Sequence, residues 1–136
     1  MSSEFETIFV RLRRILQKHA GALTVSRDEP QYYGLEGTTG PATVRAWGGK
    51  MKTPTLAVAW VHIGKAYVSF HLMPVYGDAR LLDGISKDLR SHMQGKSCFN
   101  FKRNDDALFE ELEQLTVQSF AAFRKAGFIT SQNQED

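Results

Sequence analysis

The chain has few of the residues that crosslink proteins or build metal clusters. Its 136 residues include one cysteine, Cys98, and four prolines. A single cysteine can form neither an intramolecular disulfide nor a cysteine-based metal cluster. Because unpaired cysteine is typical of reducing compartments, we expect a cytoplasmic protein that is stabilised by its hydrophobic core.

Long hydrophobic runs are also missing. The first apolar run, residues 8–10, is interrupted at once by Arg11. The longest nearly uncharged run, residues 53–64, is much shorter than the roughly 20 residues that a membrane-spanning helix needs. We therefore expect neither a signal peptide nor a membrane partner.

A large excess of one charge is absent as well, since 17 Lys and Arg face 15 Asp and Glu, for a net charge of +2. This balance argues against a nucleic-acid-binding protein, which usually carries a strong basic excess. The charges are nevertheless unevenly distributed. Residues 37–103 contain ten basic and three acidic residues, whereas residues 104–136 contain two and seven. The basic middle section indicates a small anionic molecule as the partner.

Hydrophobic residues make up 42% of the chain, too many for an intrinsically disordered protein. The length suits one domain. We expect a single α+β domain over residues 1–129, followed by a flexible polar tail over residues 130–136.

Amphipathic helices are predicted at both ends of this domain. Apolar residues recur every three or four positions over residues 5–19, which predicts a helix that stops at Gly21. The same spacing over residues 108–123 predicts a long final helix over residues 105–125, stopped by Gly127.

The residues between the helices are typical of β-strands. Strands are expected at residues 23–26, 31–35, 43–47, 56–63, 66–72 and 96–102, with turns at 28–30, 37–41 and 64–65 and loops at 47–54 and 73–78. The strand at residues 56–63 is apolar on both faces, as expected of a central strand covered on both sides. Residues 79–85 and 86–93 are predicted as two short helical pieces.

Tight turns imply antiparallel neighbours. The predicted fold is therefore α+β, with an N-terminal helix, an antiparallel sheet of about five or six strands, a short helical insert, and a long C-terminal helix packed on the sheet.

Residues 53–123 resemble the YdhG-like family of small bacterial domains of unknown function. The likeness rests on the strands at residues 56–63 and 65–72, the turn Pro74–Gly77 and the segment Gly95–Lys102. The resemblance implies an antiparallel sheet with flanking helices. Some members are described as frataxin-like iron chaperones and others as ligand-binding domains. It transfers no catalytic residues, and the N-terminal third departs from the family pattern.

A row of polar side chains is predicted on one sheet face. Alternation places Tyr67, Ser69 and His71 on the same side of their strand. If the strand at residues 96–102 is the neighbour, its polar residues line the same surface. A further wall is expected from the alternate residues Leu56, Val58, Trp60 and His62, with the loop at residues 73–78 at the mouth. The candidate ligand-binding residues are Tyr67, Ser69, His71, Asn100, Lys102, Trp60 and Tyr76.

Catalytic and metal-binding patterns are not recognisable. Cys98 beside a histidine would resemble a thiol nucleophile, but a strand interior lacks the helix N-terminus that lowers a thiol pKa. We interpret Cys98 as buried and unreactive and assign no catalytic residues. The histidines His19, His62, His71 and His92 lack metal-site spacing, so no fixed metal and no cofactor is expected.

Alternatives to a non-catalytic module stay open. A frataxin-like iron-binding chaperone would hold iron weakly on the acidic residues of the final helix, Asp105, Asp106, Glu110, Glu111 and Glu113. A nucleic-acid-binding protein would combine basic side chains with the aromatic residues Trp47, Tyr67, Phe70, Phe99 and Phe101. An enzyme would act through His71 or Cys98.

From these patterns we interpret the protein as a small cytoplasmic ligand-binding or interaction module. It is expected to prefer an anionic ligand and to exist as a monomer or homodimer.

Overall fold

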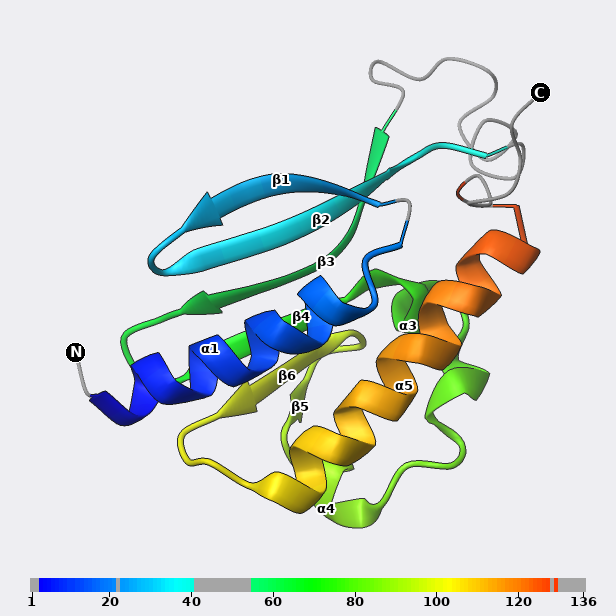
Figure 1. Ribbon diagram of the computed structural model, residues 1–136. Coiled ribbons are helices and arrows are strands. Elements are labelled where there is room, and N and C mark those ends of the chain that lie inside the picture. Colours follow the sequence, from blue (N-terminus) through cyan, green and yellow to red (C-terminus); the bar gives the residue numbers. More distant parts are fainter. Residues whose placement is uncertain (1–2, 22, 41–54, 128, 130–136) are drawn as a thin grey trace.

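Two long helices pack on one face of a six-stranded antiparallel sheet in the computed structural model, which describes residues 3–21, 23–40, 55–127 and 129 (Figure 1). The elements are α1 (Ser3–Lys18), β1 (Thr24–Glu29), β2 (Tyr32–Thr38), β3 (Thr55–Ile63), β4 (Val68–Leu72), α3 (Met73–Gly77), the 3-10 helix η1 (Ala79–Leu82), α4 (Lys87–Arg90), β5 (Met93–Gln94), β6 (Cys98–Phe101) and α5 (Asp106–Lys125). The strand order is β1-β2-β3-β4-β6-β5, and every neighbouring pair is antiparallel. The predicted α+β fold is confirmed.

The long helices form where the apolar spacing predicts them. The side chain of Asp105 accepts a hydrogen bond from the Leu108 amide at 3.1 Å and so caps α5. Gly21 and Gly127, with φ of 57° and 85°, supply the left-handed backbone that follows each helix. Capping side chains and glycines thus determine where the helices end, and packing against the sheet determines where they lie.

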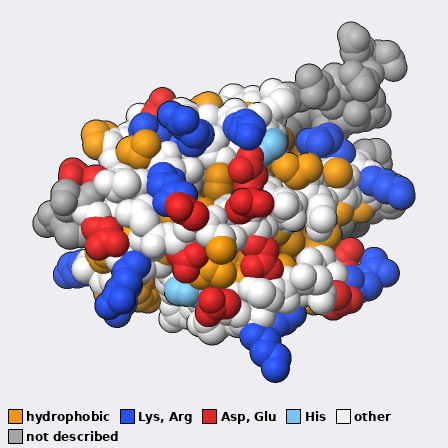
Figure 2. All heavy atoms as spheres, turned by 60° about the horizontal axis from the view of Figure 1, so that its bottom comes forward, with side chains coloured by type: hydrophobic (Ala, Val, Ile, Leu, Met, Phe, Trp, Pro, Cys, Tyr) orange, Lys and Arg blue, Asp and Glu red, His pale blue; other side chains and the backbone are white. Residues whose placement is uncertain are grey.

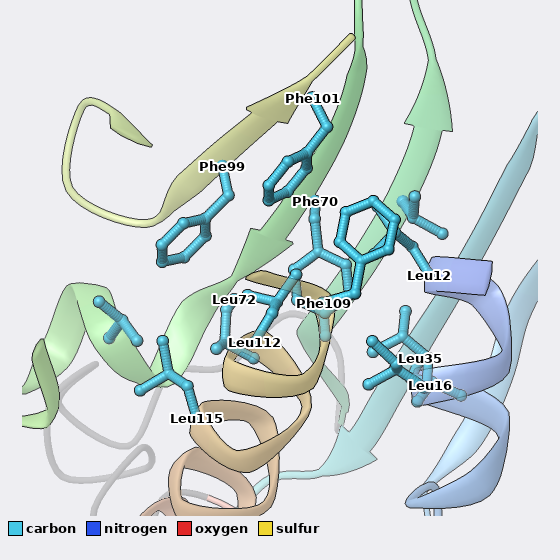
Figure 3. Close-up of a cluster of buried hydrophobic side chains, with 14 of the residues drawn as sticks. Leu12, Leu16, Leu35, Phe70, Leu72, Phe99, Phe101, Phe109, Leu112 and Leu115 are labelled. Atoms are coloured by element: carbon cyan, nitrogen blue, oxygen red, sulfur yellow. The ribbon is translucent and has the colours of Figure 1, made fainter. Parts of the chain in front are cut away.

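The core lies between the sheet and the helices. Phe70, Phe99 and Phe101 point from β4 and β6 toward Phe109 and Leu112 of α5, and all five side chains are buried (Figure 3). The rings of Phe101 and Phe109 meet edge to face at 5.1 Å. Burial of each such side chain stabilises the fold by about 1.5–3 kcal/mol. The sheet face that carries Phe70, Phe99 and Phe101 is therefore the face that packs against the helices.

Strand β3 contains a bulge that the sequence pattern does not predict. Leu35 of β2 pairs with Ala59, but the next residue, Glu36, pairs with Ala57, which leaves Val58 as the extra residue. One inserted residue shifts the alternation of side chains to the opposite face.

The bulge divides the predicted wall of alternate residues. Val58 is buried in the core and Leu56 packs against it, whereas Trp60 and His62 are half-buried on the other face. The expectation that β3 is covered on both sides is wrong for the described part of the chain. Helix α1 packs on one face, and α3, η1 and α4 all contact α5 on that same side.

Several element boundaries also differ from expectation. Residues Met73–Gly77 form a helical turn instead of the predicted loop, because Pro74 stands in its first turn, where its fixed φ favours the helix. Strands β1 and β2 extend into the predicted turns at residues 28–30 and 37–41, as far as Glu29 and Thr38, and residues 30–31 join the two strands. Strand β5 was not predicted, because two residues are too few to show alternation. The strand and loop expected at residues 43–54 lie outside the described residues.

Candidate functional site

The sheet face turned away from α1 and α5 carries the predicted polar row. Val68, Phe70 and Leu72 of β4 are buried in the core, so alternation places Ser69 and His71 on the opposite face. No helix of the described residues covers that face. We call it the polar face. Its members are Trp60, His62, Tyr67, Ser69, His71, Gln94, Cys98 and Asn100.

The register between strands brings the predicted residues together. Strand β6 is the neighbour of β4, with Ser69 opposite Asn100 and His71 opposite Cys98. On the other side of β4, His71 is opposite Trp60 of β3. The conditional prediction that β4 and β6 share this surface is therefore confirmed.

Hydrogen bonds connect the polar side chains into one network. The amide oxygen of Asn100 accepts from Ser69 Oγ at 2.7 Å and from Cys98 Sγ at 3.3 Å. The oxygen of Gln94 accepts from Asn100 Nδ2 at 2.8 Å and from the Tyr67 hydroxyl at 3.1 Å. Ser69 is only 5% exposed, so its hydroxyl holds the Asn100 side chain by a hydrogen bond and is not itself available to solvent. The network holds Tyr67 and Asn100 in fixed positions.

A stack of aromatic rings crosses the polar face. His71 lies 4.7 Å from Trp60 and 5.5 Å from His62, centroid to centroid, and Tyr32 lies 5.7 Å from His62. The planes are within 11–14° of parallel, and the Arg27 guanidinium covers the far face of Tyr32 at 3.9 Å. We call these four rings the ring stack. Burial and the neighbouring His62 lower the pKa of His71 to about 4, and burial also lowers the pKa of His62. Both imidazoles are therefore neutral at pH 7.

The aromatic residues assigned to nucleic-acid binding do not form a stacking platform. Phe70, Phe99 and Phe101 are at most 1% exposed in the core, and Trp47 lies outside the described residues. Rings that stack on one another have no free faces between them for bases. Of the described residues of that set, only Tyr67 lies on the polar face.

Cys98 is half-buried and lies 3.8 Å from His71 Nε2. Burial raises the pKa of the Cys98 thiol. A thiol with a raised pKa and an imidazole with a lowered one do not form the thiolate–imidazolium pair of a nucleophilic cysteine. The residue is less deeply buried than expected from the strand pattern.

A hollow of about 460 Å³ adjoins the polar face at the edge of β6. We call it the edge hollow. It is lined by the predicted residues Tyr67, Asn100 and Lys102, together with Arg103 and His92, which sequence reasoning did not select. The basic dipeptide at the end of β6 was the available signal for Arg103. His92 could not be selected from the sequence, because its place beside β6 depends on the unpredicted strand β5. In the structure its Nδ1 lies 2.9 Å from the Asn100 carbonyl oxygen.

The predicted site residues therefore separate into groups. Tyr67, Asn100 and Lys102 meet at the edge hollow, while Trp60 and His71 belong to the ring stack. Ser69 is buried and donates a hydrogen bond to Asn100, and the last predicted residue, Tyr76, is 58% exposed on α3. It lies with Lys96 Nζ 5.6 Å from its ring, at the opposite end of β6 from Lys102, and does not line the edge hollow.

A second hollow, of about 480 Å³, lies between α1 and α5. Two of its basic residues are paired, Arg11 with Asp106 at 2.6 Å and Lys18 with Glu113 at 3.1 Å. The space-filling view shows acidic and basic side chains interspersed over the face that it presents (Figure 2). Because these charges largely neutralise one another, this groove favours an anionic ligand less than the edge hollow does.

Most carboxylates assigned to iron binding have protein partners. Asp105 caps α5, Asp106 pairs with Arg11, and Glu111 accepts bonds from the Ser86 amide and hydroxyl. Glu113 lies 2.6 Å from His19 Nε2, and this contact, with Lys18, lowers the pKa of its carboxyl. Within the described ranges, no three His, Cys, Asp or Glu side chains are grouped so that they could hold a metal ion.

Comparison with known proteins identifies no relative: no family model, curated protein or solved structure matches this chain. None of the described helices combines the length and apolar character needed to cross a membrane.

Proposed function

We propose that this protein is a non-catalytic small-ligand-binding module whose ligand is anionic and occupies the edge hollow. The observation that supports this most strongly is the state of the two cations there. Among the described residues, neither Lys102 nor Arg103, the two cations of the hollow's lining, forms an ion pair, whereas Arg11 and Lys18 of the groove between α1 and α5 both do. Two unpaired cations on one concave surface favour an anion.

The surroundings of the cations suit a small organic anion. The hollow has a volume within the roughly 300–1,000 Å³ range of small-molecule sites. Asp105 is the acidic residue in its lining, and its carboxylate is engaged as the α5 cap. Tyr67 and Asn100, fixed by the hydrogen-bond network, supply polar groups that orient a ligand held by the two cations.

The proposal is tested by following backbone amide NMR signals of the full chain during titration at low salt. The probes are inorganic phosphate and citrate, with glycerol as an uncharged control. We expect saturable shifts at Tyr67, Asn100, Lys102 and Arg103 with the anions and none with glycerol. Shifts confined to the groove between α1 and α5, or no saturable shift at all, would reject the site.

Two earlier expectations remain predictions under this proposal. The likeness of residues 53–123 to YdhG-like domains is one, and a cytoplasmic location is the other. The anion site at Lys102 and Arg103 depends on neither.

A further inference from the structure

Cys98 and His71 place two metal-ligating atoms next to each other on the polar face, outside the edge hollow. Their side chains project from opposed positions on β6 and β4, with Sγ and Nε2 3.8 Å apart. Neither residue lines the edge hollow, although Asn100, which does, accepts a hydrogen bond from Cys98 Sγ. The pair is therefore a separate site that adjoins the proposed anion site.

The separation of the two donor atoms suits a shared metal ion. An ion about 2.3 Å from a thiolate sulfur and about 2.0 Å from an imidazole nitrogen can bridge donors up to about 4.3 Å apart. The observed 3.8 Å separation therefore has to widen by only about half an ångström to give the nearly linear arrangement that a two-coordinate soft ion prefers. The amide oxygen of Asn100, 3.3 Å from Cys98 Sγ, stands beside the same sulfur. No large movement of the strands is needed to admit an ion between sulfur and nitrogen.

The imidazole is also held in place for this role. The ring of His71 is stacked between Trp60 and His62, which fixes its plane. Cys98 Sγ is the hydrogen-bonding contact of Nε2 within the described part of the chain. A bound metal would displace the thiol proton to solvent.

The number of side chains available as metal ligands indicates which class of metal the pair can bind. Structural zinc takes four protein ligands and catalytic zinc three, whereas no group of three His, Cys, Asp or Glu is present among the residues described. Soft ions with thiolate preference, of which Cu(I) is the biological example, accept fewer ligands and favour sulfur with imidazole. We propose that Cys98 and His71 form a binding site for one soft, thiophilic cation of the Cu(I) type. Binding replaces the S–H bond with an S–metal bond, leaves His71 neutral, and releases one proton.

The test is an anaerobic competition of the full chain against a chromophoric Cu(I) chelator. The wild type is expected to withdraw one equivalent of Cu(I). Cys98→Ser should abolish this, and His71→Phe, which retains the thiol and a flat ring, should weaken the affinity by at least about tenfold, since even the loss of a supporting second-layer residue costs that much. His19→Gln is the control. It removes a histidine that contacts Glu113 and not the Cys98–His71 pair, and its affinity should equal that of the wild type.

Two outcomes would overturn the site. One is a wild type that withdraws no copper, and the other is a His71→Phe variant that binds as tightly as the wild type, which would indicate an ordinary free thiol. A second readout does not depend on how the variants fold. One equivalent of Ag(I), a redox-inert substitute, should shift the imidazole nitrogen signals of His71 in the wild type, and unchanged signals would contradict the proposal.

Discussion

The half-buried imidazole of His71 makes the stability of the fold depend on pH. In the folded protein the pKa of His71 is about 4, whereas an unfolded histidine has a pKa near 6.5. The unfolded chain therefore binds more protons than the folded one between these values. Stability is complete above about pH 6.5 and is lost as the pH falls toward 4.

The magnitude follows from the difference in pKa. A fall from about 6.5 to about 4 corresponds to at most about 3.4 kcal/mol below pH 4. The ring is only partly buried, so solvent screening reduces this ceiling to roughly half. Between pH 7 and pH 5 we expect a loss of about 1 kcal/mol in the free energy of unfolding from this residue.

Urea unfolding at pH 7 and pH 5 measures this loss. His71→Phe keeps a flat ring between Trp60 and His62 but cannot be protonated. Its stability should fall by about 1 kcal/mol less than that of the wild type over the same interval, because other titrating groups, such as Glu113, act equally in both proteins. Equal losses in the two proteins would refute the reasoning, as would a proton NMR titration that places the pKa of His71 near 6.5.

Three further predictions concern the fold. Phe70→Ala empties the fully buried centre of the sheet and should reduce the free energy of unfolding by about 3–5 kcal/mol in urea, and a loss below about 1 kcal/mol would contradict the core assignment. Asp105→Ala removes the cap of α5 and should lower the free energy of unfolding by about 1 kcal/mol. Asp105→Asn keeps a capping oxygen and should retain most of that stability, so equal losses in the two variants would show that the capping hydrogen bond is unimportant. Gly40→Ala would drive a Cβ into the Gly127 backbone, so thermal unfolding should occur at a lower temperature, whereas Gly84→Ala, in open space, should not lower it.

The sequence is most informative where one period repeats over many residues. The apolar stripes of α1 and α5 extend over several turns, so a local error does not change the prediction, and the buried residues Leu12 and Leu112 lie on them as expected. The alternation of β4 likewise places Ser69 and His71 correctly. The start of α5 at Asp106 also agrees with the helix predicted over residues 105–125.

Features that depend on the register between distant strands were not predictable. The bulge at Val58 reverses the faces of β3, and no local residue pattern marks it. The ring stack needs Trp60, His62 and His71 to meet across two strands, which follows only from the pairing. His92 joins the edge hollow because β5 pairs with β6, and β5 is too short for its alternation to be seen.

The central claim is that the unpaired cations of the edge hollow bind an anion. The most direct test compares the affinity for inorganic phosphate, at low salt, of the wild type and two double variants. Lys102→Ala with Arg103→Ala changes the edge hollow, and Arg11→Ala with Lys18→Ala removes the same charge from the groove between α1 and α5. We predict that the first weakens binding by about tenfold or more, the loss expected from removing charge-assisted hydrogen bonds, and that the second leaves it within about twofold. Equal weakening in both variants, or none in the first, would contradict the claim.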